Sequence, residues 1–244
     1  MNPDENRRQW ARRSGEFSPA YYAYYGPDAT SELLLGLLDR YVGRDARVLE
    51  LGCSSGRHLS YLHEHGFERL SGIDVNDDAF EVMATTYPDL ADAGTFHHGA
   101  IEDVVEGFED RRFDAVYSVQ TLQHVHPEAA WVFGELVRIT DDLLVTVENE
   151  GNGGDRADDD GGREGDDGDR DGDGDDRNPD DRGDGEPEVD ATAPRVNYVN
   201  GEFPLYYRDW GQVFTDLGLV EVETRTDDRD TVRVFRPTGA RSER

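Results

Sequence analysis

Val48-Leu-Glu-Leu-Gly-Cys-Ser-Ser-Gly-Arg-His-Leu59 is the most informative stretch of this chain. Its apolar, β-prone start predicts a strand, its two glycines predict a tight turn, and the following leucines have helical spacing. Glycines in such a turn let the backbone take positive φ and approach a ligand closely. The helix start then offers unpaired N–H groups to a ligand in the loop. The stretch contains neither the G-x-G-x-x-G dinucleotide pattern nor the Lys-Ser/Thr of a P-loop.

A second informative segment is the short apolar strand predicted over Leu70–Asp74, which ends in an acidic residue. A carboxylate at the end of the second strand suits a ribose diol, because it can accept from both hydroxyls. The alternative is that Asp74 caps the helix that follows. The glycine loop about 20 residues upstream favours ligand binding, since this is the spacing of nucleotide sites in α/β folds.

Together with Phe113–Val119 and Leu122–Val125, these segments resemble the class I S-adenosylmethionine-dependent methyltransferases. The resemblance covers roughly residues 20–150 and the final 45 residues. It implies an α/β, doubly wound, mostly parallel seven-stranded sheet with a C-terminal antiparallel hairpin, and S-adenosylmethionine as cofactor. The family's loop is usually D/E-x-G-x-G-x-G, and Ser54 here stands in place of the middle glycine.

The resemblance also implies cofactor contacts from the glycine loop and from the ends of the second, third and fourth strands. The residues implied are Glu50, Gly52, Cys53, Ser54, Gly56, Asp74, Val75, Ile101, Glu102, Ser118 and Val119. Asp74 would hold the ribose, and the Gly52–Gly56 backbone would pass under the methionine part. The family often places an Asp after the glycine that follows the third strand. Ala100 occupies that position here, so Glu102 and Asp103 are the candidates for the adenine amino group.

His124 is the candidate general base, because a histidine pKa can lie near neutrality and the residue follows the fourth strand. The alternative is a structural histidine that caps the next helix. His97 and His98 are adjacent strand residues whose side chains point to opposite faces, so we expect no shared metal site. His126 precedes Pro127 and is expected in a helix cap.

Alternating strands and helices predict right-handed crossovers and a parallel sheet. We expect an N-terminal aromatic, helical lid segment over 1–41 and a cofactor-binding core over 42–149. Residues 150–194 are rich in Asp and Gly and have almost no apolar residues, which predicts a disordered acidic insertion. A calcium loop is the alternative there, but the EF-hand pattern is missing. Residues 195–244 are expected to complete the same domain with a helix and two strands.

Tyr21–Tyr25, with Trp10 and Phe17, forms an aromatic cluster in the lid segment. We expect it either to cover the cofactor and shape an acceptor pocket, or to pack an N-terminal helix on the sheet edge. Four tyrosine hydroxyls favour the first role, because a plain core would have to satisfy each of them.

The composition is strongly acidic: the 244 residues carry a net charge of −30, and all 25 basic residues are arginine. This is a haloarchaeal-type composition, which predicts a salt-rich cytoplasm, where salt screens self-repulsion. An acidic surface for a basic partner is the alternative. The charge argues against a nucleic-acid partner. No apolar run approaches the ~20 residues of a membrane span, no signal peptide is recognised, and the single Cys53 excludes an intramolecular disulfide.

The leading functional hypothesis is a methyltransferase that acts on a small-molecule acceptor. The alternatives are a methyltransferase for protein or tRNA, and a non-catalytic module that binds S-adenosylmethionine. A nucleotide-dependent oxidoreductase is a weaker rival, because the dinucleotide pattern is missing. The acceptor atom, whether O, N, S or C, is not encoded in any motif of the sequence.

Overall fold

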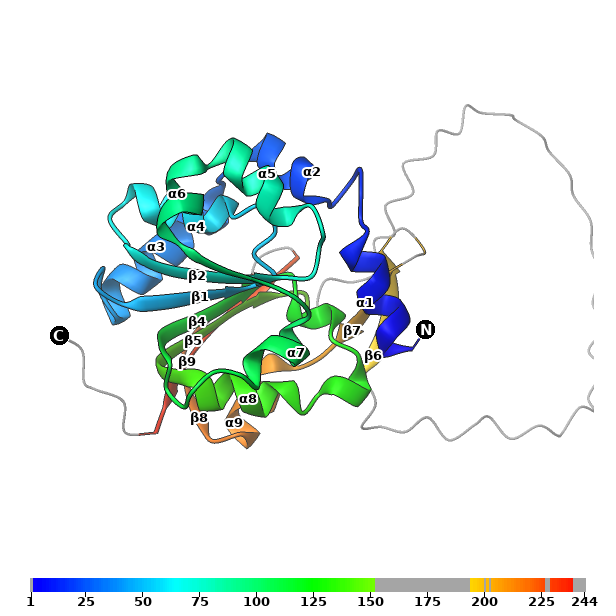
Figure 1. The fold of residues 1–244 in the computed structure, drawn as a ribbon. Coiled ribbons are helices and arrows are strands. Elements are labelled where there is room, and N and C mark those ends of the chain that lie inside the picture. The colour runs from blue at the N-terminus through cyan, green and yellow to red at the C-terminus, as the bar shows by residue number, and fades with distance from the viewer. Residues whose placement is uncertain (1, 152–193, 200, 202, 227–228, 239–244) are drawn as a thin grey trace, which may run out of the picture.

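The computed structural model describes residues 2–151, 194–199, 201, 203–226 and 229–238. A seven-stranded sheet lies between two layers of helices (Figure 1). The strands are β1 (Arg47–Leu51), β2 (Arg69–Asp74), β3 (Thr95–His98), β4 (Phe113–Val119), β5 (Thr140–Glu148), β8 (Leu219–Thr226) and β9 (Thr231–Pro237). The helices are α1 (Pro3–Ala11), α2 (Pro19–Tyr25), α3 (Ala29–Tyr41), α4 (Arg57–Glu64), α5 (Ala79–Thr86), α6 (Pro88–Ala93), α7 (Ile101–Val105), α8 (Val132–Ile139) and α9 (Trp210–Asp216).

The strand order is β3-β2-β1-β4-β5-β9-β8. The first five strands pair in parallel, whereas β9 pairs antiparallel with both β5 and β8. This confirms the predicted doubly wound sheet with its closing antiparallel hairpin. The chain moves outward from β1 to β3 and then returns to β4 on the other side of β1. Such a reversal opens a crevice at the carboxyl ends of the two central strands.

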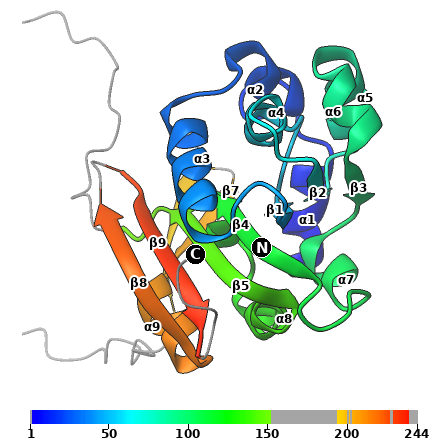
Figure 2. The ribbon, with the colours of Figure 1, turned by 90° about the vertical axis from the view of Figure 1, so that its left-hand side faces the viewer.

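The helices divide between the two faces of the sheet, and each face has its own core (Figure 2). Leucines of α3 and α4, with Met83 of α5 and Leu90 of α6, bury one face. Apolar residues of α7, α8 and α9 bury the other. Adjacent strand residues serve opposite cores, as Val116 and Tyr117 do, because strand side chains alternate.

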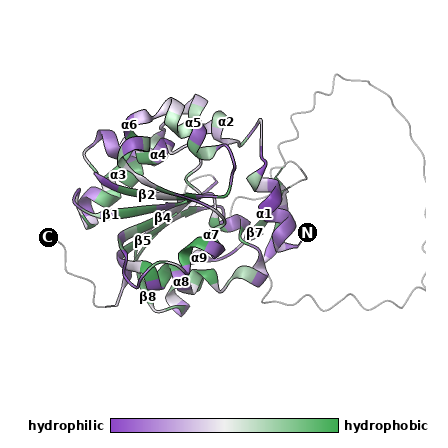
Figure 3. Ribbon diagram, in the orientation of Figure 1, coloured by the Kyte–Doolittle hydropathy of each residue, from purple (hydrophilic) through white to green (hydrophobic). Residues whose placement is uncertain are grey.

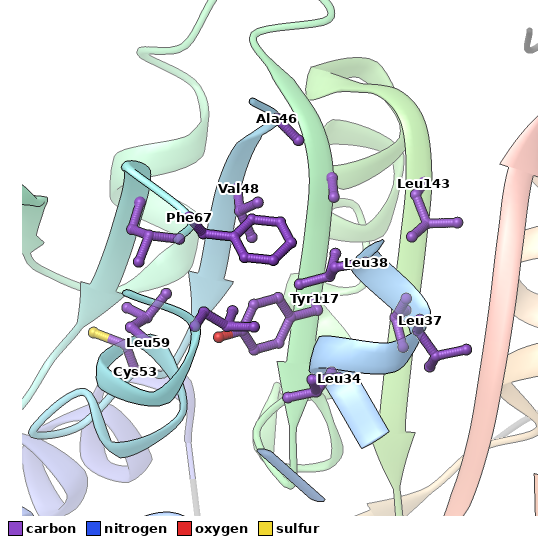
Figure 4. Close-up of a cluster of buried hydrophobic side chains, with 14 of the residues drawn as sticks. Leu34, Leu37, Leu38, Ala46, Val48, Cys53, Leu59, Phe67, Tyr117 and Leu143 are labelled. Atoms are coloured by element: carbon purple, nitrogen blue, oxygen red, sulfur yellow. The ribbon is translucent and has the colours of Figure 1, made fainter. Parts of the chain in front are cut away.

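The strands are largely apolar, α1 is mainly polar, and α8 and α9 carry many apolar residues (Figure 3). In the first core, the Tyr117 ring extends from β4 toward Cys53 and Leu59, beside the leucines of α3 (Figure 4). Burying a leucine of this kind stabilises a fold by about 1.5–3 kcal/mol. Residues of β1 and β4 are buried in both cores, and this packing on both faces of the sheet stabilises their pairing.

Local capping explains where α1 and α3 begin. The Asp28 side chain accepts from the Ser31 N–H at 3.2 Å, and the Ser31 hydroxyl accepts from the Asp28 N–H at 3.2 Å, as in a capping box. Asn2 caps α1 by accepting from the Glu5 N–H at 2.8 Å, and Pro3 occupies its first position. A separate helix at residues 3–11 is not evident from the sequence, although a helical segment was expected over 1–41.

Two strands were also missed: β6 (Arg195–Val199) and β7 (Phe203–Tyr207) form a separate antiparallel pair. Figure 1 shows this pair beside α1, at the carboxyl edge of the main sheet. The acidic insertion was expected to begin at residue 150. However, Glu150 is buried and its carboxylate pairs with Arg233 at 2.7 Å, so this residue is part of the fold. Residues 152–193 of that predicted insertion lie outside the described residues. No helix in the described part of the chain is long and apolar enough to cross a bilayer.

Candidate active site

A cavity lies in the crevice at the carboxyl ends of β1, β2 and β4, and the N-terminal helices cover it. Its walls come from the glycine loop, the loops after β2, β3 and β4, helices α1 and α2, and single residues of two other segments. Most of the predicted cofactor residues line it: Glu50, Gly52, Cys53, Ser54, Asp74, Val75, Ile101, Glu102 and Val119. Gly56 and Ser118 are outside this lining.

The glycine loop is a left-handed turn held against β2. Gly52 and Ser54 have φ values of 67° and 50°, and the Cys53 N–H donates to the Ile73 carbonyl at 3.0 Å. A Cβ at Gly52 would collide with the Thr121 side chain, so glycine is required by the close approach of the β4 loop.

Gly56 is required for packing instead. Its φ is 82°, and a Cβ there would lie 2.8 Å from Met83 and 2.9 Å from Leu90. It begins α4 against the neighbouring helices, which explains why it conforms to the motif without lining the cavity.

Asp74 fastens two loops of the site. Its Oδ2 accepts from the Ser54 N–H at 2.7 Å and its Oδ1 from the Asn76 N–H at 2.8 Å. Burial raises the pKa of this carboxyl, and the two backbone donors oppose the rise. The residue that precedes α5 is Asp78, so the alternative in which Asp74 caps that helix is wrong.

Two buried polar atoms on the cavity-lining residues, Asn6 Oδ1 and Trp10 Nε1, have no hydrogen-bond partner within the described ranges. Burial raises the pKa of Glu50 well above its usual range, and a hydrogen bond from the Tyr117 hydroxyl opposes the rise. A buried polar group without a partner is costly, so Asn6 Oδ1 and Trp10 Nε1 indicate a ligand that brings both donors and acceptors.

The β3 side of the cavity is built by the start of α7. Ala100 precedes this helix, and Ile101 and Glu102 line the cavity beside it. Asp103, the other candidate for the adenine amino group, is outside the lining and lies 3.7 Å from Arg7. Of the two acidic candidates, Glu102 is therefore the one in position.

Glu148, which the sequence analysis did not select, holds the loop after β4. Its carboxylate accepts from the Ser118 hydroxyl and from the N–H groups of Thr121, Leu122 and Gln123 at 3.1–3.2 Å. Burial raises its pKa to about 7, and these donors oppose the rise. Ser118 thus lies outside the cavity lining and contributes to the site through its hydrogen bond to Glu148. The signal in the sequence was an acidic residue that ends an apolar strand.

Arg208 holds the other end of the same loop. Its guanidinium donates to the Val125 carbonyl at 2.6 Å, and its Cζ lies 5.3 Å from the centre of the Phe133 ring. Burial lowers the pKa of Arg208 to about 10, and the Glu148 carboxylate is one of the charges that oppose this. The loop is thereby fixed by one buried acid and one half-buried base.

His124 lines the cavity from the short helix η1 (Leu122–His124). Its Nδ1 lies 3.0 Å from the Pro204 carbonyl, which can only accept, so we assign the proton to Nδ1. Its ring centre is 4.6 Å from that of Trp10. Burial lowers the His124 pKa to about 4. In the neutral ring, Nε2 therefore remains a hydrogen-bond acceptor. The ring of His124 also packs against Trp10 of the lid segment.

The other histidines have structural surroundings. His126 accepts from the Glu128 N–H at 3.2 Å and caps η2 (Pro127–Ala129), as predicted. His98 lies 3.4 Å from Asp77. Within the described ranges, no three His, Cys, Asp or Glu residues gather in a way that could hold a metal ion.

Part of the aromatic cluster covers the cavity, since Trp10, Phe17 and Tyr22 line it. Tyr24 and Tyr25 are 84% and 62% exposed and lie outside the lining. Helix α1 and the residues just after it are held at the site by three hydrogen bonds from side-chain amide groups. Asn6 donates to the His124 carbonyl at 2.7 Å, and Asn76 donates to the carbonyls of Trp10 and Arg13 at 2.9 and 3.1 Å.

Solved structures share this fold over most of the chain. A protein from Pyrococcus horikoshii has 16% identity and a TM-score of 0.57, over 86% of this chain and 90% of its own. An S-adenosylmethionine-dependent methyltransferase from Aquifex aeolicus has 14% identity and a TM-score of 0.55, over 91% and 100%. The magnesium protoporphyrin IX methyltransferase of Synechocystis, solved with bound S-adenosylmethionine, has 14% identity and a TM-score of 0.53, over 96% and 90%.

At such identities these likenesses concern the fold alone, but a family model gives a match in sequence. Residues 48–142 match a model described as a methyltransferase domain. Residues 48–142 are thus a methyltransferase domain, and the chain has the fold of the class I S-adenosylmethionine-dependent methyltransferases. No curated protein matches its sequence. The matched residues run from β1 to β5 and include most of the cavity lining described above.

The cavity of this methyltransferase fits its cofactor, S-adenosylmethionine. The molecule carries an ammonium group and an adenine amino group as donors, which suits the buried acceptors Glu50 Oε2 and Asn6 Oδ1. Its ribose diol suits Asp74, which still presents a carboxylate edge beside the glycine loop. The three carboxylates of the lining, Glu50, Asp74 and Glu102, also suit the positive charge of the sulfonium.

Proposed function

We propose that this methyltransferase transfers the methyl group to a small-molecule acceptor. The observation that carries the proposal is the aromatic cover of the cavity: Trp10, Phe17 and Tyr22 reach over it from the N-terminal segment. A covered cavity of this kind admits a small molecule more readily than a folded protein or a structured RNA. We take residues 1–41 as the lid and residues 42–149 as the cofactor-binding core.

The residues of the chain act in this proposal by positioning and by excluding water. Bound S-adenosylmethionine supplies an electrophilic methyl group. Asp74 and Glu50 orient the cofactor at two points, and the loop held by Glu148 fixes the wall beside the glycine loop. Orientation of reacting groups alone can contribute about 7–11 kcal/mol to lowering a barrier. Aromatic rings of the lid add attraction for a cation.

His124 is the proposed proton acceptor, at its Nε2 atom. The bond from Nδ1–H to the Pro204 carbonyl fixes both the tautomer and the orientation of the ring. A pKa of about 4 keeps the ring neutral at physiological pH, and it makes the ring a weak base. It therefore suits an acceptor that loses its proton as the methyl group arrives.

The net charge of −30 supports two further parts of the proposal. It disfavours tRNA as the acceptor, because nucleic-acid binding needs a basic surface. It also supports function in a salt-rich cytoplasm, where counterions screen the repulsion between carboxylates. A Tm that rises steeply with KCl concentration is the expected observation.

The test uses calorimetry and labelled methyl transfer on the full chain. We expect micromolar-range binding of S-adenosylmethionine, and transfer of label into a low-molecular-mass metabolite extract. Parallel reactions contain tRNA and total protein. Label that enters only protein or tRNA would contradict the small-molecule proposal, and cofactor binding without transfer to any fraction would favour the non-catalytic module.

A further inference from the structure

The charged side chains that line the cavity differ in sign from one part of it to another. Glu50, Asp74 and Glu102 come from the strand ends and from α7, where the cofactor is proposed to bind. Arg57 and Arg229 come from the start of α4 and from the turn between β8 and β9. A third arginine of the lining, Arg7 of α1, lies 3.7 Å from Asp103 and in range of the Glu102 charge. In a chain with net charge −30, Arg57 and Arg229 add positive potential at another part of the cavity.

Both arginines lie close enough to Tyr22 to interact with it electrostatically. The Arg57 Cζ lies 4.8 Å from the centre of the Tyr22 ring. Burial raises the pKa of the Tyr22 hydroxyl, and the positive charges of Arg57 and Arg229 oppose that rise. A phenol O–H and two guanidinium groups thus lie within electrostatic range of one another on the cavity wall.

Each arginine is held in place by a neighbour. Arg57 pairs with Asp28 at 2.9 Å, which occupies only part of a guanidinium that has five N–H donors. Arg229 donates to Gln120 Oε1 at 3.4 Å, and Gln120 Nε2 donates to Asp230 at 2.5 Å. Gln120 has a φ of 50°, a left-handed conformation that is uncommon for glutamine. Its two side-chain hydrogen bonds connect it to Arg229 and Asp230.

Apolar surface adjoins these charges. Phe17 and Trp10 line the same cavity, and Trp10 is braced by Phe203, whose ring centre lies 4.4 Å away. We propose that the acceptor is a small organic acid whose carboxylate binds between Arg57, Arg229 and the Tyr22 hydroxyl, with its apolar body against Trp10 and Phe17. This inference rests on the proposed function, since it names the acceptor class for the same site.

The cofactor also carries a carboxylate, so the two sources share one chemistry. The acceptor is favoured because Tyr22 and Arg229 lie outside residues 48–142, the segment shared with the methyltransferase domain. They are contributed by the lid and by the turn between β8 and β9. A fork of guanidinium donors recognises a carboxylate through charge-assisted hydrogen bonds.

The test measures binding on the full chain with matched probes. The probes are carboxylic acids, from acetate through phenylacetate to indole-3-acetate, each compared with its primary amide. They are titrated against protein saturated with S-adenosylhomocysteine, so that binding is measured with the cofactor site occupied. The variants are Arg57→Gln and Arg229→Gln. The control is Arg225→Gln, which changes an exposed arginine of β8 that pairs with Glu223 at the protein surface.

We expect at least one acid to bind at least about tenfold more tightly than its amide, as charge-assisted bonds imply. That preference should fall below about threefold in Arg57→Gln and Arg229→Gln and persist in Arg225→Gln, with cofactor affinity unchanged in all three. Equal binding of acids and amides would overturn the inference. So would a loss of S-adenosylmethionine affinity in both variants with the preference intact, because the arginines would then serve the cofactor. Failure of the wild-type chain to bind S-adenosylmethionine would refute the proposed function itself.

Discussion

Glu148 accepts a hydrogen bond from the backbone N–H of Gln123 at 3.2 Å, and so the end of β5 determines the shape of the loop that follows β4. The carboxylate lies outside the cavity lining, yet its donors immediately precede His124. A buried acid that satisfies backbone N–H groups in this way substitutes for solvent, which cannot reach them.

The first prediction concerns Glu148 and stability. Glu148→Ala removes the acceptor for several buried donors, so the free energy of unfolding should fall by at least about 2 kcal/mol. Urea titration at pH 7 measures it. The matched control is Glu135→Ala, which removes a partly exposed partner of Arg138 and should cost under about 1 kcal/mol. Equal losses in the two variants would show that Glu148 does not hold the loop.

The second prediction concerns pH. The Glu148 pKa is raised to about 7 in the folded chain, above its value in the unfolded chain, so the folded state binds the extra proton. The stability from this group is therefore complete below about pH 4.3, the ordinary glutamate pKa, and is lost as pH rises through 7. Glu148→Gln should flatten the difference between pH 5 and pH 8 relative to wild type. An unchanged slope would mean that the acid titrates normally.

The third prediction concerns Asp74. Asp74→Ala should weaken S-adenosylmethionine binding by about 1–3 kcal/mol for each charge-assisted bond lost, because the ribose diol loses its acceptor. The control is Asp78→Ala, since Asp78 precedes α5 but makes no side-chain capping bond. Calorimetry that finds equal affinity in wild type and Asp74→Ala would remove Asp74 from the cofactor site.

Much of this fold was readable from the sequence, because its signals are local. β1 and α4 were predicted in their places, since an apolar strand, a glycine turn and a leucine-spaced helix follow one another directly. The glycine loop and Asp74 were found for the same reason. Helix α1 was not found, because most of its side chains are polar and its role comes from long-range contacts of Asn6 and Trp10.

The remaining parts of the site depend on pairing between distant segments. Glu148 and Ser118 are 30 positions apart in sequence and meet only when β5 pairs with β4. Pro204 reaches His124 across 80 positions, through a strand pair with no alternating pattern strong enough to predict. Glu150 was assigned to the acidic insertion because its neighbours in sequence are polar, whereas its partner Arg233 lies in β9.

The fourth prediction concerns His124. If Nε2 accepts a proton, His124→Ala should lower turnover by about 100-fold or more while cofactor affinity changes little. His126→Ala is the control, since His126 caps η2 and also lines the cavity rim, and it should keep turnover within a few-fold. The pKa of about 4 predicts that wild-type turnover loses the contribution of this base only in strong acid. Normal turnover in folded His124→Ala would rule out the catalytic role and leave packing against Trp10 as its function.

The last prediction concerns the boundary of the acidic tract. The Gly151 carbonyl accepts from the Arg195 side chain at 3.3 Å, so the described residues on the two sides of positions 152–193 lie close together. A short Gly-Ser linker in place of residues 152–188 should therefore keep Tm and cofactor affinity close to wild type, since that segment is almost free of apolar residues. Glu150→Ala, only two positions before it, should lower the free energy of unfolding by about 1–3 kcal/mol, because the buried Trp210 N–H loses its acceptor while Arg233 keeps Glu221 as a partner. Scanning calorimetry in concentrated KCl compares the two. Loss of the unfolding transition in the linker variant would show that the tract stabilises the fold. An unchanged Tm in Glu150→Ala would place the boundary of the fold before residue 150.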